Sequence, residues 1–389
     1  MEHFFAPCPR GLEGLLEAEL TGLGAKDLLR APGGVAFSGD WAVCYRANLH
    51  SRLASRILWR VSRAPYRKDK AEEEIYRQAF SVPWERHFSL RETFRVQTTA
   101  SHSPVKSVNF ITLRVKDAIC DRFRNASGKR PDVDTANPGA RVQVYLSGRE
   151  CIFYLDTSGN PLWQRGQRQA RVEAPLKENL AAGILKLSGW QPGVPLLDPM
   201  CGGGTFLLEA ASIALNHAPG LDRPVFGFER LLGFDSVLWQ RLRAEALSAV
   251  RESSFPLSIC GGDVDARAAE AARRNLKAAG LEKAVVIKKR DFAGLDESDW
   301  PERGRAGILL ANPPYGERVG EYERLPELYA AMSATLKRHF AGWRAAFLSA
   351  DPDFSRLLRL KPARKTPLFN GALECRLYEF DIVAGSNRK

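Results

Sequence analysis

The chain has 389 residues, of which 44% are hydrophobic, and a formal net charge of +12. This length is typical of two or three domains that each bury a core. No run of about 18 apolar residues occurs, so the sequence predicts no membrane-spanning helix. Acidic residues interrupt the N-terminal region where a signal peptide would need an apolar run, so we expect a protein that is not exported.

The seven cysteines are scattered, and none forms a C-x-x-C pair. An odd and scattered set argues against a disulfide framework and against a zinc site. The six histidines are equally dispersed, so no metal is expected. We therefore expect a cytoplasmic protein, and its basic balance favours a polyanionic partner such as nucleic acid.

The first 60 residues have the pattern of a small α/β unit. Gly11–Leu20 carries apolar residues at helical spacing, and Val35–Phe37 is typical of a strand. Arginines at positions 52, 56, 60, 63 and 67 would form one basic stripe on a helix. Ile57–Val61 is also typical of a strand, which would scatter these arginines, and the pattern leaves both interpretations open.

The next hundred residues also mix helices and strands. The sequence predicts helices over Glu72–Phe80 and Val108–Phe123, and strands over Phe94–Thr98, Val142–Leu146 and Ile152–Leu155. Four apolar residues of the longer helix are expected to share its buried face: Phe110, Leu113, Ile119 and Phe123. The following stretch, 157–178, is polar, basic and rich in turn formers, so we place the main domain boundary there.

From about residue 175 onward, short apolar strands alternate with helices. The expected strands are Leu196–Leu197, Leu257–Cys260, Val285–Ile287, Ile308–Ala311 and Ala345–Leu348. The clearest helices between them are Ala266–Ala279 and Leu325–Phe340. This alternation predicts an α/β fold with a mostly parallel sheet covered on both faces. Asn370-Gly371 between two further strand-like runs predicts a C-terminal antiparallel hairpin.

The first candidate site follows the first of these strands. Asp198 ends the strand, and a glycine-rich turn then leads to a helix that starts near Phe206. Glycines let a ligand approach the backbone closely, and doubly wound sheets bind nucleotide-like ligands at such turns. The pattern is not a phosphate-binding loop, because no Gly-Lys-Ser/Thr follows. A carboxylate there would repel pyrophosphate but would suit the ammonium group of an amino acid.

Acidic residues also end the next two strands. Asp263 could accept hydrogen bonds from both hydroxyls of a ribose, whereas Asp265 fits the N-cap of the following helix. Asp291 could accept from an adenine amine, and Phe292 could pack on its ring.

The fourth site is Asn312-Pro313-Pro314-Tyr315, directly after the Ile308–Ala311 strand. A planar NH₂ on a base is a poor nucleophile, because its lone pair is delocalised into the ring. The Asn312 side chain and the Pro313 carbonyl could accept its two hydrogens and aim the lone pair at a methyl group. The prolines would hold these acceptors still, and Tyr315 offers a ring on which a flipped base could stack.

Together these four sites resemble class I S-adenosylmethionine-dependent methyltransferases that modify base amines. Further segments resemble the THUMP-domain RNA methyltransferases, in the group similar to the N-terminal half of the fused 23S rRNA guanine-N2 methyltransferase. These segments are Leu155–Gly159, Arg165–Gly166, Ala174–Glu178, Ala218–Leu221 and Asn312–Arg318. One difference is Gln167, which stands where the family usually has tyrosine in Arg-Gly-Tyr-Arg.

This resemblance implies three domains: a ferredoxin-like unit over 1–60, a THUMP RNA-binding domain over 61–160, and a seven-stranded Rossmann-like methyltransferase domain over 161–389. It implies S-adenosylmethionine as the cofactor. The expected cofactor-binding residues are Asp198, Met200, Cys201, Gly202, Gly204, Thr205, Asp263, Val264, Asp291, Phe292 and Asn312. The expected catalytic residues are Asn312, Pro313, Pro314 and Tyr315.

RNA is the expected partner, and basic residues of the THUMP-like segment are the candidates for contacting it. They are Lys106, Lys116, Arg122, Arg124, Lys129 and Arg130. The leading hypothesis is methylation of guanosine N2, with 23S rRNA or a large-subunit precursor as substrate. Guanine N2 of tRNA, adenine N6 of RNA, and a non-catalytic RNA-binding or ribosome-assembly protein remain alternatives. A C5-pyrimidine methyltransferase would need a cysteine nucleophile, and Cys201 and Cys375 are better explained as small buried residues.

Overall fold

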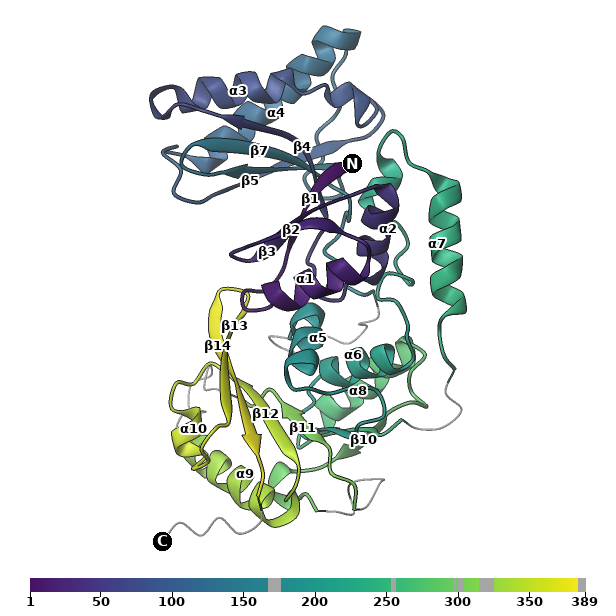
Figure 1. The fold of residues 1–389 in the computed structure, drawn as a ribbon, viewed down its shortest axis with the longest axis vertical. Helices are drawn as coiled ribbons and strands as arrows, with labels where there is room; N and C mark the ends of the chain where they lie inside the picture. The colour runs from purple at the N-terminus through teal and green to yellow at the C-terminus, as the bar shows by residue number, and fades with distance from the viewer. Residues whose placement is uncertain (167–175, 253–256, 297–298, 300–303, 315–324, 384–389) are drawn as a thin grey trace. The chain divides into compact units, whose positions relative to one another are not determined.

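The computed structural model describes residues 1–166, 176–252, 257–296, 299, 304–314 and 325–383 (Figure 1). The chain divides into two compact units. The first unit comprises Met1–Cys8, Leu16–Leu162 and Arg223–Glu245, and the second comprises Pro9–Leu15, Trp163–Asp222 and Ala246–Lys389. Among the described residues, no helix is long and apolar enough to cross a membrane.

The first unit is built on a seven-stranded sheet with the order β2-β3-β1-β4-β7-β6-β5. Its strands are β1 (Glu2–Pro7), β2 (Lys26–Ala31), β3 (Gly34–Gly39), β4 (Leu58–Pro65), β5 (Phe94–Ala100), β6 (Ala140–Leu146) and β7 (Glu150–Asp156). Strand β4 pairs with β1 on one side and with β7 on the other. The segment that could have been a basic helix is therefore a strand, which scatters the five arginines.

Three of the helices between residues 13 and 127 were predicted from the sequence, and the one over Trp41–His50 was not. The helices of this stretch are α1 (Glu13–Gly22), α2 (Trp41–His50), α3 (Ala71–Ser81) and α4 (Val108–Ser127), with the 3₁₀ turns η1 (Lys68–Lys70) and η2 (Trp84–Arg86). Helix α4 begins at Ser107, whose hydroxyl accepts from the Phe110 N–H at 3.2 Å. It ends at Gly128, whose left-handed φ of +73° suits a residue without a side chain.

The predicted buried face of α4 is partly wrong. Ile119 and Phe123 are buried as expected, but Phe110 and Leu113 are 44% and 49% exposed. The residues that face the core recur every four positions: Ile111, Val115, Ile119 and Phe123. This four-residue spacing follows one face of a helix, and Phe110 and Leu113 lie on the opposite face.

The second unit contains a seven-stranded sheet with the order β10-β9-β8-β11-β12-β14-β13. Its strands are β8 (Leu196–Asp198), β9 (Ile259–Asp263), β10 (Val286–Lys289), β11 (Ile308–Ala311), β12 (Arg344–Ser349), β13 (Arg364–Asn370) and β14 (Leu373–Asp381). The first five run parallel, and β14 pairs antiparallel with both β12 and β13. The predicted parallel sheet and its C-terminal hairpin at Asn370-Gly371 are thus confirmed.

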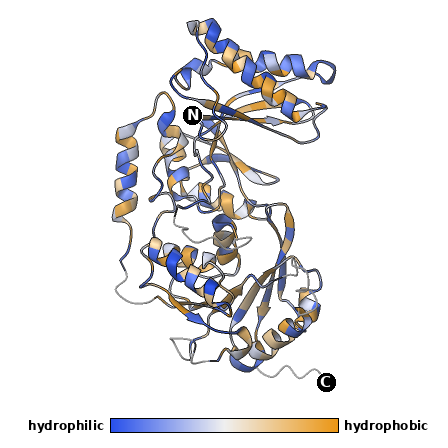
Figure 2. Ribbon diagram, turned by 180° about the vertical axis from the view of Figure 1, so that it is seen from behind, coloured by the Kyte–Doolittle hydropathy of each residue, from blue (hydrophilic) through white to orange (hydrophobic). Residues whose placement is uncertain are grey.

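Helices cover both faces of this sheet (Figure 1). They are α5 (Glu178–Leu187), α6 (Thr205–Ala214), α8 (Ala266–Ala278), α9 (Leu325–His339) and α10 (Phe354–Leu357), with the 3₁₀ turn η4 (Phe292–Gly294). Between α6 and β9 the chain also forms η3 (Gly227–Arg230) and α7 (Ser236–Ser248). Figure 2 shows mixed polar and apolar residues along these helices, as expected where one face meets a core.

Strand β9 begins later than predicted, at Ile259. It also ends later, at Asp263, because it includes two glycines after Cys260. A Cβ on Gly261 would lie 2.3 Å from the Leu207 Cδ1 of α6. Glycine therefore allows α6 to pack directly on the strand. The sequence pattern stopped the strand at Cys260 because glycine is uncommon inside strands, whereas helix packing requires it here.

Candidate active site

Four predicted site residues follow four adjacent parallel strands. Asp291 lies just beyond β10, Asp263 ends β9, Asp198 ends β8 and Asn312 follows β11. These strands are neighbours in the order β10-β9-β8-β11. Because parallel strands end at the same edge of a sheet, the four side chains are arranged along the edge where open α/β sheets bind ligands.

The turn after β8 places a carboxyl group in the interior. Asp198 is 2% exposed, and its Oδ1 accepts a hydrogen bond from the Met200 N–H at 3.2 Å. Burial raises the pKa of this carboxyl well above its ordinary value, and the nearby Asp263 raises it further. Among the described residues no cation pairs with Asp198. A buried carboxylate that lacks a positive partner suits a ligand that brings an ammonium group.

Glycine backbone shapes the rest of this turn. Gly202 and Gly204 adopt left-handed φ angles of +52° and +80°, and Gly204 is the N-cap of α6. A Cβ on Gly204 would lie 3.2 Å from the Cβ of Ala272 on α8. The Cys201 N–H donates to the Gly262 carbonyl at 2.8 Å, which ties the turn to β9. Larger residues would force α6 and α8 apart at this point.

Asp263 connects the two turns. Its Oδ2 accepts from the Gly202 N–H and its Oδ1 accepts from the Asp265 N–H, both at 2.9 Å. Each carboxylate oxygen can accept a second hydrogen bond, so both stay able to bind hydroxyl groups of a ligand. Asp265 is confirmed as the N-cap of α8, because its side chain accepts from the Arg267 N–H at 2.8 Å. The neighbouring Val264 is 63% exposed.

The turn after β10 is more tightly packed than the sequence predicted. Asp291 caps η4 by accepting from the Ala293 N–H at 3.1 Å. The Phe292 ring is 2% exposed and lies 6.4 Å from the Phe347 ring in the core of this sheet face. Little of that ring is left to pack on an adenine.

The turn after β11 carries a buried hydrogen-bond acceptor. Among the described residues, the Asn312 Oδ1 is buried and has no hydrogen-bond partner. Pro313 is buried, and Pro314 accepts a hydrogen bond at its carbonyl from the Tyr329 hydroxyl at 3.0 Å. Tyr315 lies outside the described residues. Sequence reasoning missed Tyr329, because it lies in a helix and no motif connects it to the turn.

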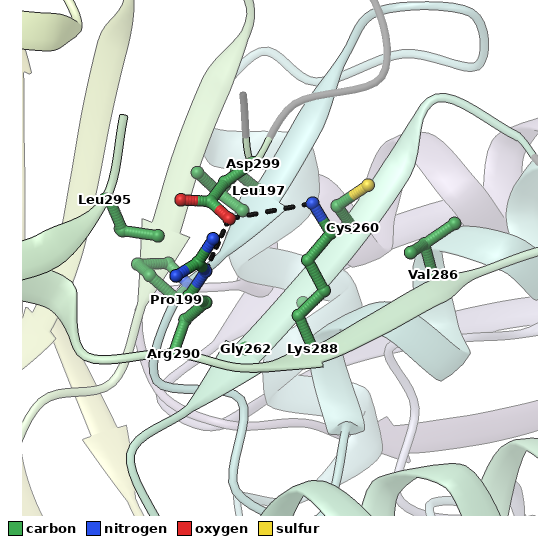
Figure 3. A pocket seen from close by; sticks show the side chains of 10 residues that line it. Leu197, Pro199, Cys260, Gly262, Val286, Lys288, Arg290, Leu295 and Asp299 are labelled. Atoms are coloured by element: carbon green, nitrogen blue, oxygen red, sulfur yellow. Dashed lines mark hydrogen bonds and ion pairs between the residues drawn. The ribbon is translucent and has the colours of Figure 1, made fainter. Parts of the chain in front are cut away.

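A small pocket lies on one face of the same sheet (Figure 3). Its empty volume is about 270 Å³ including open solvent, and Leu197, Gly262 and Lys288 are among its lining residues. Asp299 closes one side, with its Oδ1 2.6 Å from the Arg290 Nε and 3.6 Å from the Lys288 Nζ (Figure 3). Side chains alternate between the two faces of a strand, so Asp198 and Asp263 point away from the face that Leu197 and Gly262 line. The pocket therefore differs from the predicted cofactor site.

Half of the predicted RNA-binding residues are engaged within the protein. Arg122 donates to Glu85 at 3.0 Å, Arg124 to Asp121 at 2.7 Å, and Lys116 pairs with Asp117. The other three are exposed and form no ion pair with the described residues: Lys106, Lys129 and Arg130. The arginines near β4 are also partly engaged, since Arg56 pairs with Asp156 and Arg63 with Glu150.

Three family models match successive parts of the chain. Residues 3–58 match the RlmL ferredoxin-like domain, 69–156 the THUMP domain and 165–379 the RMKL-like methyltransferase domain. The ribosomal RNA large subunit methyltransferase K/L of Aeromonas hydrophila is 42% identical over 99% of this chain and 55% of its own length. The protein of the same name from Syntrophotalea carbinolica is 40% identical over 98% of this chain and 53% of its own length. The chain thus spans about half the length of the curated relatives it matches.

Two solved structures have a similar fold over nearly the whole chain. SMU.472 in complex with SAH has a TM-score of 0.86 and 32% identity, covering 100% of this chain and 99% of its own. A predicted N6-adenine-specific DNA methylase from Listeria monocytogenes has a TM-score of 0.86 and 31% identity, covering 97% and 96%. The methyltransferase model alone matches more than half of the chain. The chain therefore belongs to the family of RMKL-like methyltransferases, which depend on S-adenosylmethionine.

Proposed function

We propose that this chain transfers the methyl group of S-adenosylmethionine to the exocyclic N2 of a guanosine in 23S rRNA. The observation that carries this proposal is the Oδ1 of Asn312 at the carboxyl end of β11, which is buried and has no hydrogen-bond partner in the described part of the chain. Strand β11 pairs with β8, which ends in Asp198, so the acceptor lies next to the predicted cofactor site. A buried acceptor costs free energy unless a ligand satisfies it, which fits a site for an amine.

The residues of the cofactor site fit S-adenosylmethionine. Asp198 supplies a buried negative charge for the ammonium of the methionine part, and Asp263 supplies two carboxylate oxygens for the ribose hydroxyls. The glycine backbone at Gly202 and Gly204 allows a close approach. When bound, the cofactor supplies an electrophilic methyl group attached to a sulfonium.

The residues after β11 make the target amine reactive. The Asn312 Oδ1 and the Pro313 carbonyl accept one hydrogen bond each from the two amine hydrogens. This shifts the nitrogen towards tetrahedral geometry and directs its lone pair to the methyl carbon. S-adenosylmethionine held beside Asp198 would supply the methyl group, and the amine nitrogen held by Asn312 and Pro313 would lose one proton to solvent as it gains that methyl group. No cysteine takes part: Cys201 and Cys375 are buried, and burial raises the pKa of the Cys201 thiol well above its ordinary value.

We further propose the domain organisation that the resemblance implies. Residues 1–60 form the ferredoxin-like unit, 61–160 the THUMP RNA-binding domain and 161–389 the methyltransferase domain. The RNA would contact the exposed cations Lys106, Lys129 and Arg130, rather than the arginines that already pair with Glu85 and Asp121. Exposed cations of this kind would bind the RNA backbone and recognise its shape.

Cofactor affinity should rise with pH in the acidic range. Because burial raises the pKa of Asp198, this carboxyl is protonated over a wider pH range in the free protein. Binding an ammonium requires the carboxylate, so binding releases a proton, and affinity falls by up to about tenfold per pH unit below that raised pKa. Calorimetry at a series of pH values above the ordinary carboxyl pKa and below the pKa of the cofactor's own amine measures this effect.

The Asp198→Asn variant is the control for this pH dependence. It keeps the shape of the side chain but cannot release a proton, so its weaker binding should not change with pH over the same range. Without cofactor, the raised pKa means that the folded protein binds more protons than the unfolded chain. The free energy of unfolding should then fall as pH rises, and the variant should lack this decrease. A wild-type affinity that stays constant with pH contradicts the ammonium contact.

The three exposed cations should contribute most of the RNA affinity of the THUMP segment. A variant with Lys106, Lys129 and Arg130 all changed to alanine should bind RNA more weakly, with a smaller dependence on salt. Each lost phosphate contact should reduce the slope of log affinity against log salt by about 0.7 to 0.9. Arg122→Ala with Arg124→Ala should change the slope less, because both side chains are paired within the protein. Equal slopes for the two variants would contradict this assignment.

The proposed substrate can be tested with labelled S-adenosylmethionine and deproteinised total RNA from a strain that lacks the gene. Label in the 23S fraction supports the proposal, and label in tRNA alone would move the activity to another RNA. No label, with cofactor binding shown by calorimetry, would favour a precursor particle as substrate. Absence of both label and cofactor binding would favour a non-catalytic RNA-binding protein.

Adenine N6 is the second candidate target. The acceptors at Asn312 and Pro313 would hold any exocyclic base amine, and the similar Listeria monocytogenes structure is described as a predicted N6-adenine-specific methylase. We propose guanine rather than adenine because of the resemblance to the guanine-N2 enzymes. Identifying the modified nucleoside distinguishes the two targets.

A further inference from the structure

A buried tyrosine touches the turn that carries the proposed catalytic acceptors. Tyr329 lies in the second turn of α9 and is 0% exposed. Its hydroxyl donates a hydrogen bond to the Pro314 carbonyl oxygen at 3.0 Å. The bond joins α9 to the chain just beyond Asn312 and Pro313.

The surroundings of Tyr329 hold its ring in one place. The ring meets the Phe354 ring edge to face, with 4.9 Å between centroids, and Phe354 itself packs on Phe347 of β12. Met332 and Leu336, which follow on the same helix, are fully buried in this core. A close-packed interior permits few alternative rotamers, so the hydroxyl stays at a fixed point. The helix thus provides a rigid support for the Pro314 carbonyl.

The chain between the sheet and this support has little freedom left. Ala311 is held in the sheet by its pairing with Phe347. The rings of Pro313 and Pro314 fix two φ angles near about −65°, and each residue before a proline is kept out of the helical region. The hydrogen bond from Tyr329 fixes the direction of the Pro314 carbonyl, and this restricts the ψ angle of Pro314. Asn312 is therefore restrained from both ends.

We propose that Tyr329 is a positioning residue: its hydroxyl fixes the Pro314 carbonyl and thereby holds the Asn312 and Pro313 acceptors against the target amine. This inference rests on the proposed function, because it assigns Tyr329 a role through the acceptors named there. Tyr329 itself touches neither the amine nor the methyl group. Its contribution is to keep the two acceptors in place before the base arrives, which lowers the cost of reaching the reactive geometry.

The Tyr329→Phe variant isolates this role, because it removes only the hydroxyl and keeps the ring on Phe354. We expect kcat to fall by about tenfold to a hundredfold, since a displacement on the order of 1 Å at a reacting centre has effects of this size. KM for S-adenosylmethionine should stay within about twofold, because the Tyr329 hydroxyl bonds to Pro314, which is not among the expected cofactor-binding residues. A purely structural role would lower thermal stability and leave kcat of the folded enzyme unchanged.

Tyr378→Phe is the matched control. Tyr378 is 1% exposed, its ring lies 5.3 Å from the same Phe354 ring, and its hydroxyl donates to the Asp351 carbonyl at 3.4 Å. The change removes a buried hydroxyl from the same core, and this hydroxyl bonds to Asp351 rather than to Pro314. Its kcat should equal that of the wild type. Its melting temperature then shows how much stability a lost buried hydroxyl costs at this place.

A double variant tests whether Tyr329 acts through the acceptors. In an Asn312→Ala background, Tyr329→Phe should reduce kcat by much less than in the wild type, because the main acceptor is already gone. Equal fold-changes in both backgrounds, or a Tyr329→Phe enzyme with wild-type kcat, would overturn the positioning role while leaving the proposed function intact. If the wild type itself transfers no methyl group to RNA, the proposed function fails, and this inference fails with it.

Discussion

Replacing Asn312 with alanine should reduce turnover by about 10²- to 10³-fold while leaving the affinity for S-adenosylmethionine nearly unchanged. The reason is the position of the Asn312 Oδ1, which is buried, without a partner among the described residues, and next to the strand that carries Asp198. Alanine removes an acceptor that strengthens its contact as the amine nitrogen becomes tetrahedral. Such a contact contributes to the transition state more than to binding.

Single-turnover kinetics with saturating RNA would measure this loss directly. Calorimetry with S-adenosylmethionine and a thermal melt serve as controls, since both should match the wild type. Because the Asn312 Oδ1 has no partner among the residues that the structure describes, its removal should not destabilise the fold. Turnover close to that of the wild type would rule out the proposed activation of the amine.

The second large effect is expected at Asp263. Asp263→Ala should weaken S-adenosylmethionine binding by about 10²-fold or more, because two hydrogen bonds to a charged group contribute about 1.5–3 kcal/mol each. The carboxylate also holds the Gly202 N–H at 2.9 Å, so its loss would loosen the turn that we propose to bind the methionine part. The Asp263→Asn variant keeps one acceptor oxygen, so its affinity for S-adenosylmethionine should lie between that of the wild type and that of Asp263→Ala.

The neighbouring carboxylate provides a matched control. Asp265→Ala removes the N-cap of α8 and should lower the free energy of unfolding by about 0.5–2 kcal/mol. Cofactor affinity should change little, since the Asp265 side chain accepts from Arg267 rather than facing the glycine turn. Equal losses of affinity in Asp263→Ala and Asp265→Ala would show that the ribose contact is assigned to the wrong residue.

Much of the second unit could be predicted from the sequence, because its signals are local. Short apolar strands, the glycine-rich turn after Asp198 and the Asn370-Gly371 hairpin each have a specific pattern within a few residues. The parallel order then places Asp291, Asp263, Asp198 and Asn312 at one edge as a consequence of topology. The N-cap role of Asp265 could be predicted for the same reason, since a cap depends only on the first turn of its helix.

Features that depend on distant packing could not be predicted in this way. The hydrogen bond between Tyr329 and Pro314 joins residues in different elements, and no local sequence pattern in either element predicts it. The predicted buried face of α4 included Phe110 and Leu113 because apolar residues occur on more than one side of this helix. Likewise, the RNA candidate Arg122 pairs with Glu85, which comes from a distant segment of the chain. The pair of Arg124 with Asp121 is different, because it spans three residues of one helix and its spacing is local.

The identity of the methylated nucleoside tests the central claim most directly. The wild-type protein and Asn312→Ala would be incubated with unmodified RNA and S-adenosylmethionine, and the digested nucleosides separated by mass spectrometry. We predict N2-methylguanosine with the wild type, reduced by about 10²-fold or more with the variant. N6-methyladenosine would keep the amine chemistry but contradict the guanine target. A carbon-methylated pyrimidine would contradict the mechanism itself.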